Sequence, residues 1–106
     1  MKLMNINNTI VDFFGKEVLT VDESGQNKKG LTYKDAMMVA LLNSPKQGET
    51  DEEKYKKFEL AKKISQAKDE LVIESPEQKL IRNCSAVAWG TLVHGLLVDF
   101  IEGKEA

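Results

Sequence analysis

The spacing of the apolar positions changes near residue 30, and this change divides the chain into two predicted parts. Before it, apolar residues form short runs rich in valine, isoleucine and phenylalanine, which favour strands. We predict a β-hairpin with strands at about 9–14 and 17–22 and a tight turn near Gly15. The polar, glycine-bounded segment 22–30 is predicted to be a loop.

The first helix is predicted to begin after Thr32 and to run to about Asn43. The Thr32 hydroxyl is placed to accept a hydrogen bond from the backbone N–H of Asp35, as helix N-caps do. Apolar residues cover much of this helix, so we expect it to be well buried. Pro45 ends it, because a residue before proline is disfavoured in the helical conformation.

A second helix is predicted at about 51–69, with Thr50 as its N-cap. Acidic residues precede basic ones by four positions, which favours exposed ion pairs along one side. These pairs are Glu52–Lys56, Glu53–Lys57 and Glu59–Lys63. The expected buried stripe is Tyr55, Phe58, Ala61 and Ile64, with Leu60 and Ala67 as further candidates.

The last third is predicted to be mostly helical. Residues 71–73 form either a short strand or an extended plug of the core. A third helix starts with Ser75 as N-cap, Pro76 in the first turn and Gln78 as capping partner. A straight helix from there to Gly103 would be about 40 Å long, longer than such a domain is wide. We therefore expect a bend or break, either around 83–86 or near Gly90, and a frayed tail at 103–106.

These elements predict an α+β fold that is predominantly α, with an N-terminal β-hairpin packed on a small bundle of three to four helices. We expect one domain over 1–106, with the hairpin and loop at 1–30 and the bundle at 31–103. A chain of 106 residues can bury one modest core without metal or disulfide.

Charge and cysteine content narrow the classes of function. The formal net charge of −2 argues against nucleic acid or an anionic membrane as partner. The single cysteine excludes an internal disulfide, so we expect a reducing compartment. No signal-peptide pattern is visible at the start, and the longest uncharged run is too short to span a bilayer.

Candidate chemistry is sparse, so we predict no enzyme, no cofactor and no metal. His94 is the only histidine and Cys84 the only cysteine. Cys84 is expected in the core, and His94 is expected to be buried or half-exposed with one hydrogen-bond partner. If His94 has a function, a pH-sensitive interface suits it better than catalysis. The acidic run 51–53 lacks the spacing of a calcium loop, so we interpret it as a solvated helix start.

The uncharged segment 83–98 holds the only tryptophan and must be buried, in the core or against a partner. Internal packing is the simpler interpretation. The alternative is a self-association or partner surface on the closing helix. The candidate interface residues are Trp89, Val93, Leu96, Leu97, Phe100 and Ile101.

Two motifs carry a resemblance to known proteins. One is Leu31-Thr32-x-x-Asp35 leading into Ala40-Leu41-Leu42, and the other is Glu53-Lys54-x-Lys56-x-x-Glu59-Leu60-Ala61. From about Val11 on, the chain resembles a group of small phage and prophage proteins with a short β element and a closing helix pair. The resemblance implies a phage-encoded protein in the bacterial host cytoplasm and carries over no catalytic residues.

Two hypotheses of function follow. The first is a non-enzymatic phage-encoded protein that binds a host protein and inhibits or redirects it. The alternative is an accessory protein of virion morphogenesis, in tail or head–tail assembly, that self-associates through the C-terminal helix.

Overall fold

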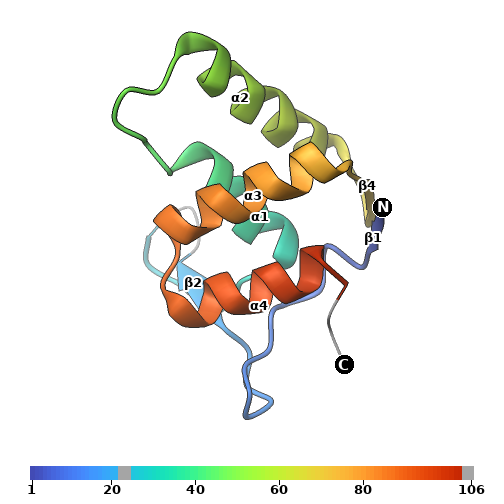
Figure 1. The fold of residues 1–106 in the computed structure, drawn as a ribbon. Coiled ribbons are helices and arrows are strands. Elements are labelled where there is room, and N and C mark those ends of the chain that lie inside the picture. The colour runs from blue at the N-terminus through green and yellow to red at the C-terminus, as the bar shows by residue number, and fades with distance from the viewer. Residues whose placement is uncertain (22–24, 104–106) are drawn as a thin grey trace.

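In a computed structural model, which describes residues 1–21 and 25–103, two small sheets accompany four helices (Figure 1). The predicted class, α+β and predominantly α with a hairpin ahead of a helical bundle, is confirmed. The helices are α1 (Tyr33–Leu42), α2 (Asp51–Gln66), α3 (Ser75–Ala88) and α4 (Thr91–Ile101). The strands are β1 (Lys2–Met4), β2 (Leu19–Val21), β3 (Lys28–Gly30) and β4 (Glu70–Val72).

The helices enclose one hydrophobic core, with α1 at its centre. Helix α1 contacts α2, α3 and α4, and its inward side is built from Ala36, Met37, Ala40 and Leu41. Fully buried side chains from the other helices close around it, among them Ile64, Ile81 and Leu97. The prediction that the first helix is well buried is therefore correct.

The strand prediction at the N-terminus was only partly right. A turn forms at Gly15, but the segments around it share one isolated bridge, between Val11 and Glu17. The longer pairing joins β2 to β3, which lies in the segment predicted to be a loop. Residue 22, the predicted end of the second strand, lies outside the described residues.

The predicted hairpin is short because three segments share a closed ring of backbone hydrogen bonds at its base. Ile10 N–H donates to the Leu31 carbonyl at 2.7 Å, Leu31 N–H to Val18 at 2.7 Å, and Val18 N–H to Ile10 at 2.8 Å. Ile10 and Leu31 are buried and Val18 is half-buried. Three segments thus share these bonds, so no long two-stranded hairpin forms.

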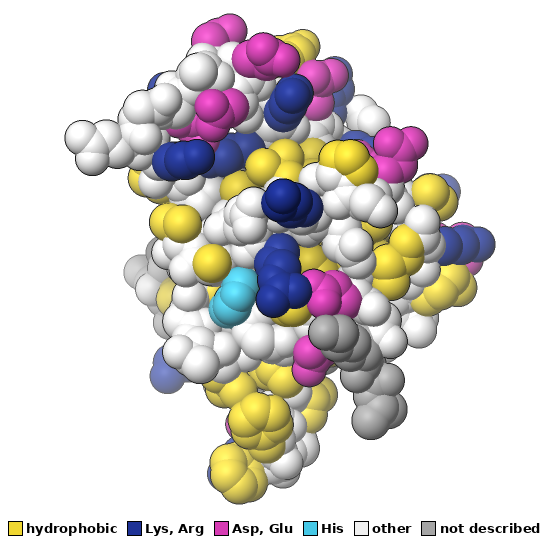
Figure 2. Space-filling view, in the orientation of Figure 1, with side chains coloured by type: hydrophobic (Ala, Val, Ile, Leu, Met, Phe, Trp, Pro, Cys, Tyr) yellow, Lys and Arg dark blue, Asp and Glu magenta, His cyan; other side chains and the backbone are white. Residues whose placement is uncertain are grey.

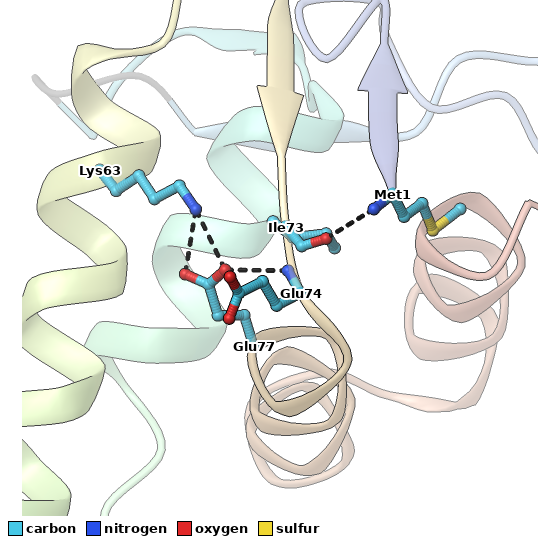
Figure 3. A network of polar contacts seen from close by, with 5 residues as sticks. All are labelled: Met1, Lys63, Ile73, Glu74 and Glu77. Carbon is cyan, nitrogen blue, oxygen red and sulfur yellow. Dashed lines mark hydrogen bonds and ion pairs between the residues drawn. The ribbon is translucent and has the colours of Figure 1, made fainter.

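Strand β1 was not predicted. Its partner β4 confirms the strand alternative for 71–73. Leu3 pairs with Leu71, and both are buried. The Met1 backbone nitrogen donates to the Ile73 carbonyl at 2.9 Å, which extends this pairing (Figure 3). The start of the chain is thereby fixed beside the start of α3.

Helix α2 begins as predicted, with the Thr50 hydroxyl accepting from Glu53 N–H at 3.1 Å. It ends at Gln66 rather than 69, because Ala67 adopts the extended conformation that leads into β4. Leu60, Ala61 and Ile64 are buried. Tyr55 and Phe58 were expected in the buried stripe but are 58% and 53% exposed, because the first half of α2 projects beyond the other helices (Figure 1).

Of the predicted ion pairs on α2, Glu52–Lys56 is present at 3.6 Å. Lys63 instead contacts Glu77 on α3, at 3.0 and 3.1 Å (Figure 3). Lys57 instead pairs with Glu49. In both cases the lysine contacts a less exposed carboxylate from another part of the chain, where attraction is less screened.

Helix α3 starts one residue earlier than predicted. Glu74, not Ser75, is the N-cap, and Glu74 N–H donates to the Glu77 carboxylate at 2.9 Å (Figure 3). The capping partner is therefore Glu77 rather than Gln78. Gln78 instead donates to the Ile101 carbonyl at 2.5 Å, which ties α3 to the end of α4.

The expected break in the closing helix occurs at Gly90, one of the two predicted places. Trp89 is extended, with φ −116° and ψ 151°, and Gly90 is the N-cap of α4. Helices α3 and α4 therefore pack against each other instead of forming one long rod (Figure 1). The predicted tail at 103–106 lies outside the described residues except for Gly103.

Candidate protein-interaction surface

Residues 9–21 form an arm, and its far end projects from the helical body as a tight turn (Figure 1). Asp12 N–H donates to the Lys16 carbonyl at 2.8 Å, and Gly15 N–H donates to the Asp12 carbonyl at 3.2 Å. Gly15 has a φ of 78°, which glycine adopts without strain. This is the hydrogen-bond pattern of a three-residue hairpin loop with a G1 bulge.

The Asp12 side chain fixes the conformation of this tip. Its Oδ1 accepts hydrogen bonds from Phe14 N–H at 2.8 Å and from Lys16 N–H at 3.0 Å. An aspartate at the start of a turn stabilises it in this way. Phe13 and Phe14 occupy the two central positions of the turn, and they are 83% and 85% exposed.

The outer face of the arm carries three more apolar side chains beside Glu17. Val11 pairs with Glu17, and Leu19 and Val21 follow Glu17 at alternate positions, so these side chains share one side of the pleat. All three apolar residues are exposed. We call Val11, Phe13, Phe14, Leu19 and Val21 the arm surface. Figure 2 shows hydrophobic side chains gathered at the end of this projection.

A groove runs between the tip of the arm and α4. It is lined by Phe13, Thr91, Leu92, Gly95, Leu96 and Asp99. Asp99 is the only charged residue in this lining, so the apolar surface of the arm continues onto the helix.

The interface predicted on the closing helix lies mostly inside the fold. Leu97, Phe100 and Ile101 are buried, so a partner cannot reach them without opening the core. Trp89, Val93 and Leu96 are half-buried against that core. The structure thus brings these residues together as internal packing, and of the set only Leu96 lines a groove with the arm.

Two specific contacts explain why this segment faces inward. The Trp89 indole N–H donates to the Ala36 carbonyl at 3.0 Å, which joins the end of α3 to α1. The Phe100 ring stacks on Tyr33, with centroids 3.9 Å apart and planes within 9°. Each contact uses an aromatic group to connect a closing helix to α1.

His94 and Cys84 have the surroundings that were predicted for them. Cys84 is buried in the core. His94 is half-buried, and its Nδ1 lies 2.9 Å from the hydroxyl oxygen of Ser85, which is fully buried. Within residues 1–21 and 25–103, no three histidine, cysteine or acidic side chains are grouped as a metal would require. None of the described helices has the length and apolar character to cross a membrane.

A second concave region lies between α2, α3 and the loop that joins α1 to α2. Lys57 is largely buried there, where it pairs with Glu49 and donates to the Ser44 carbonyl at 2.8 Å. Leu80 and Val87 supply apolar walls from α3. Because its acidic and basic groups are interspersed, this region favours neither an anionic nor a cationic ligand.

Comparisons of the chain with protein-family models, with curated proteins and with solved structures give no match. The arm surface is therefore identified from its geometry alone. The sequence pattern did not reveal this surface, because Phe13 and Phe14 fall within a predicted strand. One signal was available: the Asp-Phe-Phe-Gly run places aspartate and glycine where a tight turn needs them, which leaves the phenylalanines at its apex.

Proposed function

We propose that this chain is a non-enzymatic, phage-encoded protein that binds a host protein in the bacterial cytoplasm through the arm surface and inhibits or redirects it. The main support for this proposal is the exposure of the two phenylalanines at the tip of the arm. Two adjacent phenylalanines stand more than four-fifths exposed at the apex of a turn whose backbone is fixed by hydrogen bonds. The phage context rests on the sequence resemblance.

Both phenylalanine rings contribute little burial to this fold, because they are 83% and 85% exposed. Burying an aromatic ring of this size in a partner's pocket is worth about 2–3 kcal/mol. A tip that is already ordered loses little conformational entropy on binding, so more of that gain appears as affinity. Rigid aromatic side chains at the centre of an interface commonly dominate its binding energy.

The partner chemistry that fits is a protein with an apolar pocket for one or both rings, beside a flat apolar strip for Val11, Leu19 and Val21. Lys16, Glu17 and Lys28 are exposed. Glu17 lies opposite Val11 and Lys28 lies opposite Val21, so a partner also needs polar groups that pair with these charges.

The experiment compares three forms of the tagged chain expressed in bacterial cells: wild type, Phe14→Ser, and the matched control Phe58→Ser. Both substitutions remove an exposed phenylalanine, but Phe58 lies on α2, away from the arm. The proposal expects one host protein to be recovered by wild type and by Phe58→Ser and to be lost with Phe14→Ser. That protein, purified, should form a complex of fixed stoichiometry with the chain and change its own activity on binding.

Equal recovery of every protein by all three forms would refute the arm as the binding surface. A complex that forms but leaves the host protein's activity and cellular location unchanged would refute inhibition and redirection. Recovery of the chain mainly in phage particles would favour the alternative, a virion morphogenesis accessory protein.

A further inference from the structure

Helix α4 presents one exposed face that the core does not use. Thr91, Leu92, Gly95 and Asp99 are exposed, and Thr91 and Leu92 precede Gly95 by four and three residues while Asp99 follows it by four, which places them along one side of the helix. The same side lines the groove beside Phe13. This face, rather than the buried side of α4, is the part of the closing helix that another molecule can reach.

Gly95 is unexplained by the packing of this chain. It lies in the interior of α4, where glycine destabilises a helix relative to alanine. Its φ is not in the left-handed region, and a Cβ atom built there would meet no atom within 4 Å. No contact within this chain therefore requires glycine at this position. A second backbone that packs closely against it from outside would require it.

Two polar features of α4, one near each end, also have no side-chain partner among the described residues. The helix begins at Gly90, which offers no side-chain cap, so the N–H groups of its first turn have no side-chain acceptor there. Near the other end, Asp99 forms no ion pair or side-chain hydrogen bond with any residue in the described ranges. An acid there faces the negative end of the helix dipole, and the last turn contains no base.

We propose that a second copy of this chain covers this face, with the two α4 helices packed antiparallel and crossing at Gly95. Asp99 and Thr91 lie four residues on either side of Gly95, or about 6 Å along the axis. An antiparallel two-fold pair therefore sets Asp99 of one copy level with Thr91 of the other. Each carboxylate then meets the uncapped, positive start of the neighbouring helix.

The same arrangement accounts for the apolar part of the groove. Without a side chain at Gly95, the two backbones approach closely, and Leu92 and Leu96 fill the space on either side of the crossing. Phe13 of each copy borders the groove from the arm. The contact is self-complementary, so it closes as a dimer and does not propagate.

This inference is independent of the proposed host partner, because it is tested on the purified chain alone. Light scattering on a sizing column gives the mass at micromolar and near-millimolar concentrations. We expect twice the chain mass of 11.9 kDa at the higher concentration. Phe14 does not line the groove, so Phe14→Ser should leave the dimer intact while it tests the host-protein proposal.

Two substitutions test the face. A Cβ at Gly95 meets no atom of the single chain within 4 Å, and leucine improves helix propensity, so the thermal unfolding midpoint of Gly95→Leu should be unchanged or higher while the dimer is lost. Asp99→Asn should raise the dimer dissociation constant about ten-fold, because each dimer loses two carboxylate–helix contacts. Lys62→Leu and Glu59→Gln make comparable changes on exposed positions of α2 and should not alter the mass.

A wild-type chain that stays at 11.9 kDa at both concentrations overturns the proposal. A dimer that survives Gly95→Leu with unchanged dissociation constant overturns this face as its interface. Should Gly95→Leu fail to fold, Asp99→Asn decides the question alone, since an unchanged dissociation constant there excludes the carboxylate–helix contact.

Discussion

The helical body and the arm use the same kinds of apolar residue for opposite purposes. In the body, Ile64, Ile81 and Leu97 are completely removed from solvent. In the arm, Phe13 and Phe14 are almost completely in it. The difference lies in what each residue packs against: α1 supplies a surface for the body, whereas none of the residues at 1–21 and 25–103 covers the tip of the turn. Apolar character therefore marks stability in one region and a candidate for recognition in the other.

The sharpest test of this contrast is the core substitution with the largest expected cost. Ile81→Ala removes a fully buried side chain from the middle of α3. We expect unfolding free energy to fall by about 4 kcal/mol, from lost transfer energy and the cavity left behind. Urea unfolding followed by circular dichroism measures it. A loss below about 1 kcal/mol would mean that the helices repack around the site and that this core is not tightly specified.

Trp89 is half-buried at the edge of the core, and its substitution should lower the unfolding free energy somewhat less than Ile81→Ala does. We expect Trp89→Ala to lower the unfolding free energy by about 3 kcal/mol, since its ring packs against the core and its indole N–H donates to Ala36. Trp89→Phe keeps most of the ring and removes the donor, so about 1 kcal/mol of that loss should remain. A change near zero for Trp89→Ala would place this ring among the exposed residues and restore it as a partner contact.

How far the sequence predicts each region follows from the range of the interactions involved. The starts of α1 and α2 were predicted because Thr32 and Thr50 bind backbone N–H groups only three residues away. Strand β1 was missed because its partner β4 lies far along the chain. Strand β3, Lys28–Gly30, has no strand pattern of its own and is extended because β2 pairs with it.

The candidate site was hidden for a related reason. A helical stripe identifies which side of α2 holds Tyr55 and Phe58, but not whether another element extends far enough to cover them. In the same way, the run at Phe13 and Phe14 shows apolar character without showing that a turn lifts both rings away from the body. Exposure is a property of the packed chain, so the pattern alone predicted the core better than the surface.

A smaller effect is expected where the tip of the arm is fixed. Asp12→Ala removes the acceptor for Phe14 N–H and Lys16 N–H, and we expect a loss of about 1 kcal/mol in unfolding free energy. Amide hydrogen exchange should accelerate at Phe14 and Lys16 while the amides of α1 keep their protection. Asp12→Asn retains an acceptor oxygen and serves as the control. Unchanged exchange at the tip in Asp12→Ala would show that the turn is held by its backbone alone.

The smallest expected effect is the most informative about function. Phe14→Ser should change unfolding free energy by less than about 0.5 kcal/mol, because the ring is 85% exposed and leaves no cavity when removed. Urea unfolding of Phe14→Ser beside Ile81→Ala measures the contrast directly. If Phe14→Ser lowers the unfolding free energy by more than about 1 kcal/mol, the ring packs within this chain in solution. The main support for the proposed function is then removed. If the cost is negligible while binding to a host protein is lost, then Phe14 contributes to recognition and not to folding, which is the distinction between arm and body.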